Sequence, residues 1–216
     1  MAELLFNDGL RYDKKQKYLI IDFETENLSL SSGNKPWQAS FLVAQNKEIL
    51  EEHNYFIKWP NLNVSKGAAI ATGFDQSVID GKGQNPEKIL DIVEKYINNK
   101  EYKILFYNGL KFDIHILNIW RKELNRKANF DYIDRCIDVL SLFKATKMQV
   151  GYDSNESFLF WQNRILNYYK RGLKSNLTLA CKELGIEVEG NFHDALNDVR
   201  ATYYVFLEML KVFNLK

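Results

Sequence analysis

The most unusual side chains in this sequence are carboxylates that lie within or directly after apolar segments. Asp22 and Glu24 follow the apolar run Leu19–Ile21 and are two residues apart. In an extended strand this spacing places both side chains on the same face of the sheet. Two buried like charges are unfavourable without a cation, and no Lys or Arg lies between Lys17 and Lys35. The pair therefore indicates a bound metal ion, although carboxylates at a strand end that reach solvent would give the same pattern.

Two further acids repeat this pattern on predicted helices. Asp113 precedes Leu117 by four residues, so it flanks the apolar stripe of its helix. Asp198 lies on the face of the last predicted helix that should be packed. Oxygen ligands without Cys or paired His favour Mg²⁺ or Mn²⁺ over a structural zinc ion. Such acidic clusters carry out phosphoryl transfer.

One histidine is placed to take part in this chemistry. His193 lies five residues before Asp198, so the two would point to different helix faces if both were helical. We therefore expect His193 at the start of the last helix. A histidine beside metal-bound water has a pKa suited to accept a proton near neutral pH. The alternative is a histidine without a chemical role, which is the interpretation we give to His53 and His115.

Hydrophobic periodicity predicts the elements that must position these residues. The predicted strands are Lys17–Glu24, Gln38–Gln45, Lys47–Lys58, Lys103–Tyr107 and Ile133–Leu140. The predicted helices are Pro86 to near Asn98, Phe112–Trp120, Glu156–Arg171, Asn176–Leu184 and Asp194–Phe213. Asn85 and Asp194 are expected to cap helix starts, and Gly185 to end a helix. Strands first and then alternating strands and helices predict an α/β fold with a mixed sheet.

Composition indicates an ordinary globular protein. The chain has 216 residues, 46% of them hydrophobic and 26% charged, which fits one domain (1–216) and excludes disordered and low-complexity classes. The formal net charge of +1 neither requires nor excludes a polyanionic partner. Cys136 and Cys181 are expected to be reduced packing residues. Without a membrane-length apolar run or a secretory signal, we expect an intracellular, cytoplasmic protein without a membrane partner.

Three motifs, in order and spacing, resemble the DEDDh group of DnaQ-like 3′ to 5′ exonucleases. Asp22-Phe23-Glu24-Thr25 stands at the D-x-E-T motif, residues 108–113 (NGLKFD) at N-x-x-x-F-D, and residues 193–198 (HDALND) at H-x-x-x-x-D. Residues 71–74 (ATGF) resemble the family's T-G loop, and residues 177–186 resemble the helix before the third motif. The resemblance covers most of the chain. It implies a ribonuclease H-like fold, with a central mixed five-stranded sheet flanked by helices.

The resemblance also implies a metal-dependent mechanism with two Mg²⁺ ions, for which Mn²⁺ would substitute. Asp22, Glu24 and Asp198 would hold the ion that activates water, and Asp22 with Asp113 the ion facing the leaving 3′ oxygen. His193 would be the general base. The products would be nucleoside 5′-monophosphates released one at a time from a 3′ end.

Contacts to the substrate are a further implication. Phe23, Thr25 and Leu28 would lie near the terminal 3′-OH, Phe74 would wedge against the last bases, and Asn108 would touch the backbone. Core packing is the alternative for Leu28 and Phe74. We expect single-stranded DNA rather than RNA because the Asn-Gly start of the second motif is more like the DNA repair exonucleases than the oligoribonucleases. A polymerase or repair protein is a candidate partner, as in proofreading.

Residues 144–174 depart from the compact family pattern and form a basic, aromatic insertion. Its cations are Lys144, Lys147, Arg164, Lys170, Arg171 and Lys174, and Trp161, Tyr168 and Tyr169 are interleaved with them. This composition predicts either a surface that binds single-stranded nucleic acid by charge and stacking, or a solvated helix face with its aromatic residues turned inward.

Other functions compete with the DNA exonuclease. An exoribonuclease is the nearest alternative, and a catalytically silent nucleic-acid-binding or polymerase-associated module is another. The complete set of acids and His193 argues against a silent module. An HD-type phosphohydrolase could use His193-Asp194, but it needs further histidines on other helices, and only His53 and His115 remain.

Overall fold

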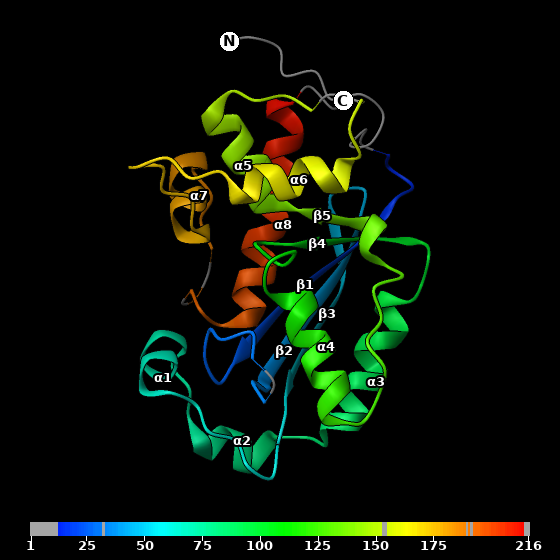
Figure 1. The fold of residues 1–216 in the computed structure, drawn as a ribbon, viewed down its shortest axis with the longest axis vertical. Coiled ribbons are helices and arrows are strands. Elements are labelled where there is room, and N and C mark those ends of the chain that lie inside the picture. Colours follow the sequence, from blue (N-terminus) through cyan, green and yellow to red (C-terminus); the bar gives the residue numbers. More distant parts are fainter. Residues whose placement is uncertain (1–12, 32, 153–154, 189, 191, 214–216) are drawn as a thin grey trace.

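Five strands in the described part of the chain form one mixed sheet at its centre. Figure 1 shows a computed structural model, in which residues 13–31, 33–152, 155–188, 190 and 192–213 are described. The strands are β1 (Lys17–Thr25), β2 (Pro36–Gln45), β3 (Glu48–Phe56), β4 (Tyr102–Phe106) and β5 (Cys136–Asp138). Their order is β3-β2-β1-β4-β5; β1, β2 and β3 pair antiparallel, whereas β4 pairs parallel with both β1 and β5. The sheet confirms the predicted α/β fold class.

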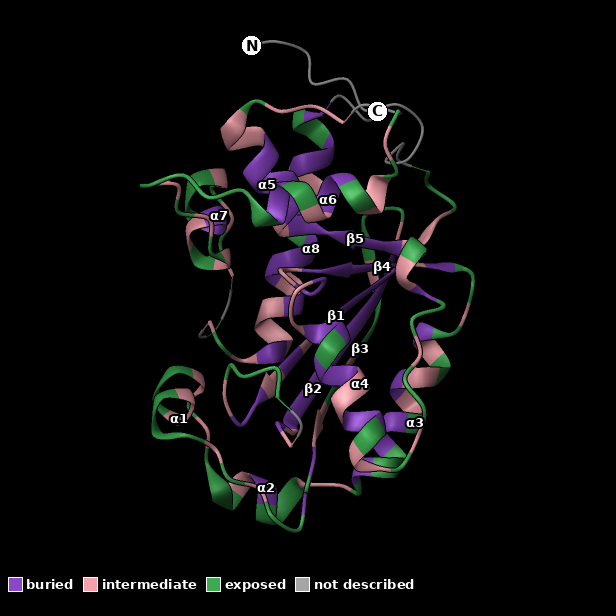
Figure 2. Ribbon diagram, viewed as in Figure 1, coloured by how far each residue is buried: buried purple, intermediate pink, exposed green. Residues whose placement is uncertain are grey.

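Helices cover both faces of this sheet and divide the core into two clusters. Residues of α3 (Pro86–Ile97) and α4 (Asp113–Glu123) pack on one face. The other face packs against α5 (Val139–Met148), α6 (Phe158–Asn167), α7 (Leu177–Leu184) and α8 (Ala195–Val212). Two short helices, α1 (Lys66–Thr72) and α2 (Gln76–Lys82), connect β3 to α3, and a 3₁₀ turn (η1, Ile133–Arg135) precedes β5. Figure 2 shows the buried residues concentrated on the sheet, whereas α1 is largely exposed.

Strand β1 is buried on both faces, as expected for a central strand. Tyr18 and Ile20 belong to the cluster that packs against α5 to α8, whereas Leu19 and Ile21 belong to the cluster on the α3 and α4 face. Because side chains alternate along a strand, the even-numbered residues that follow Ile20 also face α8. The strand therefore directs its carboxylates toward the last helix.

The predicted helix boundaries that depend on capping residues are confirmed. The Asn85 side chain accepts hydrogen bonds from the first turn of α3, and Asp194 caps α8 by accepting from Leu196 N at 3.0 Å. Gly185 ends α7 in the left-handed conformation, with φ of 67°, which glycine adopts without strain.

The cysteine prediction is also confirmed, because Cys136 and Cys181 are both free and buried. In the described ranges, none of the helices combines the length and the apolar composition that crossing a membrane requires.

The predicted strand Ile133–Leu140 is wrong at both ends. Only Cys136–Asp138 pair with β4, because Ile133–Arg135 form a 3₁₀ turn and α5 begins at Val139. The Asp138 carboxylate starts that helix by accepting from Leu140 N at 3.1 Å. Helices α1, α2 and α5 were not predicted from the periodicity, and α6 ends at Asn167 rather than at residue 171.

The insertion is divided between inward and outward side chains; its residues 153 and 154 lie outside the described ones. Trp161 is fully buried, so the expectation that it contacts nucleic acid is wrong, and the inward-facing alternative holds for it. Lys144 is also buried, and Arg164 pairs with Glu156. Phe160 and Arg164 are exposed within α6, and the exposed cations and aromatic residues that follow α6 are Tyr168, Tyr169, Lys170, Arg171 and Lys174.

Candidate active site

Strand β1 brings Asp22 and Glu24 to the same face of the sheet, next to β2. Asp22 lies opposite Ser40, and Glu24 lies opposite Gln38. The register between β1 and β2 shifts directly after Glu24, where the strand is about to end. The two carboxylates therefore stand side by side at the end of the strand, as their spacing predicts.

The start of α8 supplies the second part of the site. Asp198 lies in the first turn of this helix, and its backbone N–H donates to the Asp194 carbonyl at 3.0 Å. Asp194 Oδ1 also accepts from Gln38 Nε2 at 3.3 Å, which ties the helix start to the β2 residue opposite Glu24. The capping residue thus positions α8 against the strands that carry the first two acids.

His193 immediately precedes this cap, as predicted from its spacing to Asp198. Its φ of 67° lies in the left-handed region, which is uncommon for residues other than glycine, although His, like Asn and Asp, adopts it more often than most. Such a conformation costs on the order of 1–3 kcal/mol and persists only where the surrounding structure enforces it. The strained backbone and the exposed side chain place the imidazole at the mouth of the site.

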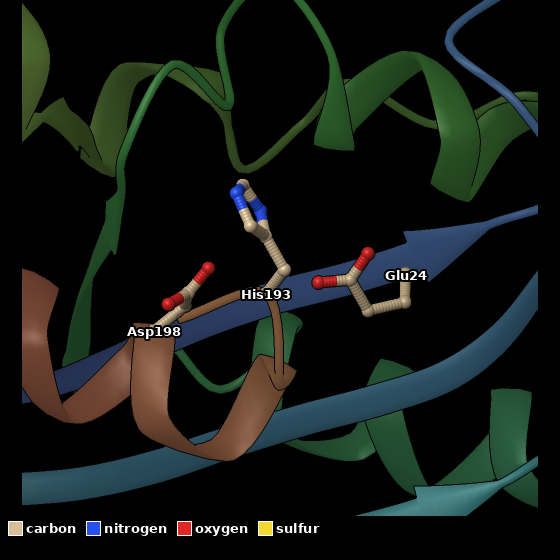
Figure 3. Close-up of side chains that lie close together, drawn as sticks. All are labelled: Glu24, His193 and Asp198. Carbon is tan, nitrogen blue, oxygen red and sulfur yellow. The ribbon is translucent and has the colours of Figure 1, made fainter. Parts of the chain in front are cut away.

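Glu24, His193 and Asp198 form a compact group, shown in Figure 3. One ligand atom from each residue lies within 4.8 Å of the others. Asp198 Oδ1 is buried without a hydrogen-bond partner in the described structure, which is unfavourable for a carboxylate oxygen. An unpaired buried oxygen beside a second carboxylate fits a divalent cation of the oxygen-preferring class.

Asp113 approaches the same strand from α4. It is the first residue of that helix, is only 3% exposed, and accepts a hydrogen bond from Phe23 N at 3.2 Å. Asp22 and Asp113 lie outside the three-residue group, but the charge of Asp113 raises the pKa of both Asp22 and Glu24. The four predicted acids are therefore brought into one electrostatic cluster.

The pKa values of these acids show that the cluster lacks compensating positive charge. Burial, with repulsion from the neighbouring acids, holds the pKa of Asp22 well above its ordinary range and raises that of Glu24 to about 9. Burial raises the pKa of Asp113 to about 7. For Asp198 it raises the pKa to about 6, against an opposing effect of His193. Without a cation, part of the cluster retains protons at neutral pH.

A further buried acid, Asp138, is not among the site residues predicted from the sequence. Its Oδ1 accepts from Asn108 N at 2.9 Å and its Oδ2 from Leu110 N at 3.0 Å, so it fixes the loop that leads to Asp113. Burial raises its pKa to about 6 despite these hydrogen bonds. The signal was available, because Asp138 directly follows the apolar pair Cys136-Ile137 much as Asp22 follows its own apolar run.

The residues predicted to contact substrate differ in accessibility. Leu28 is 86% exposed, in the loop between β1 and β2. Phe23 packs edge-on against Trp120, with ring centroids 6.0 Å apart. The Thr25 hydroxyl donates to the Asn27 carbonyl at 2.6 Å. The side chains of Phe23 and Thr25 are thus held inside the protein.

Phe74 and Asn108 have intermediate exposure. Phe74 packs edge-on against Trp37 at a centroid distance of 5.1 Å. Asn108 adopts a left-handed conformation, with φ of 71°, and donates its backbone N–H to Asp138. The other histidines are accounted for locally: His53 stacks on Phe41 at 4.5 Å, and His115 is exposed on α4.

A hollow of about 710 Å³ lies beside the three-residue group. It is lined by Ile70, Ala71, Thr72, Gly73, Gly190, Phe192, His193, Asp194 and Asn197. The segment predicted as the T-G loop therefore faces the start of α8 across a space large enough for a nucleotide. Such an open, polar hollow next to clustered acids is suited to a phosphate-bearing ligand.

Comparisons with known proteins show which solved structures share this fold. The zinc-bound form of the Escherichia coli exonuclease I–ssDNA complex has a TM-score of 0.72 and 19% identity, with 92% of this chain and 42% of that chain covered. A product-bound structure of exonuclease I has a TM-score of 0.71 and 18% identity, with 93% and 45% covered. At this identity the likeness establishes the fold, and the chain spans less than half the length of these exonucleases.

The search of curated proteins gave no match. The sequence matches the RNase_T family, described as "Exonuclease", over residues 19–206, which include all three motifs. This match and the fold confirm the resemblance to DnaQ-like exonucleases of the ribonuclease H-like superfamily. The chain therefore belongs to the RNase_T exonuclease family.

Proposed function

We propose that this domain is a metal-dependent 3′ to 5′ exonuclease that removes nucleoside 5′-monophosphates from single-stranded DNA. The observation that carries the proposal is the convergence of Glu24, His193 and the unpaired Asp198 Oδ1 on one point. A metal-binding pair of carboxylates with an adjacent exposed imidazole is suited to phosphodiester hydrolysis.

Four acids would hold two divalent ions, Mg²⁺ or Mn²⁺. Asp22, Glu24 and Asp198 would bind one, and Asp22 with Asp113 the other. When bound, divalent ions lower the pKa of water and stabilise negative charge on the leaving oxygen. The raised pKa values of Glu24 and Asp113 support this assignment, because burial without a cation disfavours their charged forms.

His193 acts as the general base in this proposal. Its exposed ring beside Glu24 and Asp198 accepts the proton of the attacking water, and the carboxylates stabilise the resulting imidazolium. General base catalysis of this kind contributes roughly 10²–10⁴ in rate. The left-handed backbone at His193 directs the side chain toward Glu24 and Asp198.

The choice of DNA rests on two supports. The Asn-Gly start of the second motif favours it, and exonuclease I structures that share the fold were solved with single-stranded DNA. Exposed Leu28 and partly exposed Phe74 would contact the terminal bases without sequence preference. A polymerase or repair partner stays a prediction of the sequence resemblance.

The experiment is digestion of matched 5′-labelled single-stranded DNA and RNA with Mg²⁺, with an EDTA control. We expect a ladder that shortens from the 3′ end of the DNA, and its loss with EDTA or in Asp22→Ala. Asp131→Ala removes an exposed acid outside the cluster and should digest like the wild type. Faster cleavage of RNA would replace DNA with RNA as the substrate, and no cleavage of either would favour a binding module.

A further inference from the structure

The loop that follows α6 carries the most exposed aromatic residue of the described chain next to two exposed cations. In this segment, residues 168–175 (the α6–α7 loop), Tyr168 is 47% and Tyr169 87% exposed. Lys170 and Arg171 are also exposed, and within the described residues neither side chain has an ion pair or hydrogen bond. Figure 1 shows the loop as the yellow segment between α6 and α7. Unpaired cations beside solvent-facing rings indicate a surface for a polyanion with planar groups.

Two lysines of the insertion fix both ends of this loop. Lys144 Nζ donates to the carbonyls of Leu166 and Tyr168, each at 2.9 Å. Lys147 Nζ donates to the Lys174 carbonyl at 2.9 Å. These cations therefore do not contact a ligand themselves; they hold the backbone that presents the exposed residues.

The α6–α7 loop is also attached to the connection that leads from β4 to Asp113. The Tyr107 hydroxyl donates to the Ser175 carbonyl at 2.7 Å, and Lys111 Nζ donates to the Leu166 carbonyl at 3.3 Å. Tyr107 and Lys111 belong to the connection between β4 and α4 that contains the second motif. The exposed residues are thus positioned relative to the active site by direct hydrogen bonds at both ends of the loop.

The middle of the loop is a tight turn that projects these residues. Leu173 N donates to the Lys170 carbonyl and Lys174 N to that of Gly172, both at 3.0 Å. Gly172 has φ of 85°, a conformation that favours glycine. A hollow of about 560 Å³ opens between the turn and the end of α5 and is lined in part by Tyr168, Lys170 and Arg171. Its size suits a nucleotide.

We propose that the α6–α7 loop binds single-stranded DNA upstream of the nucleotide being removed. Tyr168 and Tyr169 stack on bases, and Lys170 and Arg171 contact phosphates. Because the loop is fixed before binding, little conformational entropy is lost on association. The inference rests on the proposed function, since it extends the substrate path of the same site.

The composition of the loop favours a single strand over a duplex. A base can stack on a tyrosine ring only when its own face is free, which pairing and stacking within a duplex prevent. The loop therefore selects unpaired DNA, and we expect a blunt duplex of the same length to bind more weakly.

Binding to a fluorescent 12-nucleotide DNA in EDTA, where cleavage is prevented, tests the loop separately from catalysis. Tyr169→Ala should weaken binding by about 5- to 150-fold, corresponding to roughly 1–3 kcal/mol per stacked base. Lys170→Ala with Arg171→Ala should lower the slope of log K against log salt by about 1.4, because each single-strand phosphate contact contributes about 0.7.

Two control variants match these changes outside the loop. Lys122→Ala with Lys127→Ala removes two exposed cations near the end of α4, and Phe130→Ala removes an exposed ring. Both should bind DNA like the wild type. If the controls weaken binding as much as the loop variants, or if the salt slope of the loop variant is unchanged, the proposal is overturned.

Cleavage with Mg²⁺ separates this proposal from the proposed function. The loop variants should raise the KM for the 12-nucleotide DNA more than the KM for a trinucleotide, because a trinucleotide has fewer bases and phosphates to contact the loop. If the wild type cleaves both lengths and the variants match it on both, the loop proposal fails while the exonuclease stands. If the wild type cleaves neither, the proposed function fails, and the binding measurements alone decide on the loop.

Discussion

The Asp113 carboxylate accepts a hydrogen bond from the backbone N–H of Phe23 at 3.2 Å. Phe23 lies between Asp22 and Glu24, so the first residue of α4 is fixed to the strand position that separates the first two acids. Because the donor is a backbone group, this link does not depend on the side chain at position 23. The relative positions of three predicted metal ligands are therefore set by main-chain geometry.

Replacing Asp113 with Asn tests whether its charge or its hydrogen bond matters. The Asn amide oxygen can still accept from Phe23, so Asp113→Asn should fold, whereas Asp113→Ala should lose about 1–3 kcal/mol of unfolding free energy. Both should lose about 100-fold or more in cleavage rate, because a metal site is worth several kcal/mol in the transition state. Thermal denaturation and single-turnover digestion give the two quantities; an Asp113→Asn protein with full activity would exclude a metal-binding role.

The metal-free protein should become less stable as pH rises. The pKa of Glu24 is about 9 in the folded protein, above the ordinary value of 4.5, so the folded state binds this proton more tightly than the unfolded state. The free energy of unfolding therefore falls as pH increases between these values. In EDTA the melting temperature should be lower at pH 8.5 than at pH 6. Over this range the folded state binds about one proton more than the unfolded state.

Mg²⁺ should reverse this trend, since ions bind the deprotonated carboxylates and their stabilising effect grows with pH. Glu24→Gln should show a weaker pH dependence than the wild type in EDTA and a smaller response to Mg²⁺. A wild-type melting temperature that rises from pH 6 to 8.5 without metal would contradict the assignment of a raised pKa to this cluster.

His193 should contribute to rate and not to metal binding. His193→Ala should reduce single-turnover cleavage by roughly 10²–10⁴, while Mn²⁺ titration by calorimetry remains close to wild type. His193→Asn is the matched control, because Asn tolerates the left-handed backbone found at this position. Equal losses in both variants would assign the effect to the ring, and unchanged turnover in either would remove the histidine from the mechanism.

Asp138 should act through the loop that it holds. Asp138→Asn places an amide N–H₂ against backbone donors, so we expect about 1–3 kcal/mol of destabilisation and a fall of tenfold or more in cleavage rate. Gln162→Leu is the control. The Gln162 side chain accepts from Asp138 N at 2.6 Å and donates to the Cys136 carbonyl, but it does not hold the loop that leads to Asp113. At a temperature where both variants are folded, similar rates for the two would reduce Asp138 to a structural role.

The elements that carry the site were predictable because their signals are local and strong. Strand β1 is a continuous apolar run followed by acids, and α8 combines a capping Asp194 with a long apolar stripe. Both patterns follow from burial and from the unsatisfied backbone groups of a helix start. These local patterns predicted that Asp22, Glu24 and Asp198 are each buried, and the resemblance to DnaQ-like exonucleases predicted that they converge.

The elements that were missed lack such signals. Helix α1 has no buried residue and α2 has only Ile79, so neither shows an apolar stripe. Both depend on capping by Ser65 and Asp75, which looks like ordinary loop chemistry in a sequence. The start of α5 is rich in apolar residues and therefore resembles the continuation of strand β5. The strand ends there because the Asp138 side chain caps the helix, which the sequence alone does not show.

The order in which the site residues occur along the chain has a consequence for biosynthesis. A nascent polypeptide that has been translated through α7 already contains Asp22, Glu24 and Asp113, but neither His193 nor Asp198. Helix α8 packs against both β1 and β2, and its start carries the last two residues of the site. A nascent domain therefore cannot complete the acidic cluster until α8 has packed on the sheet.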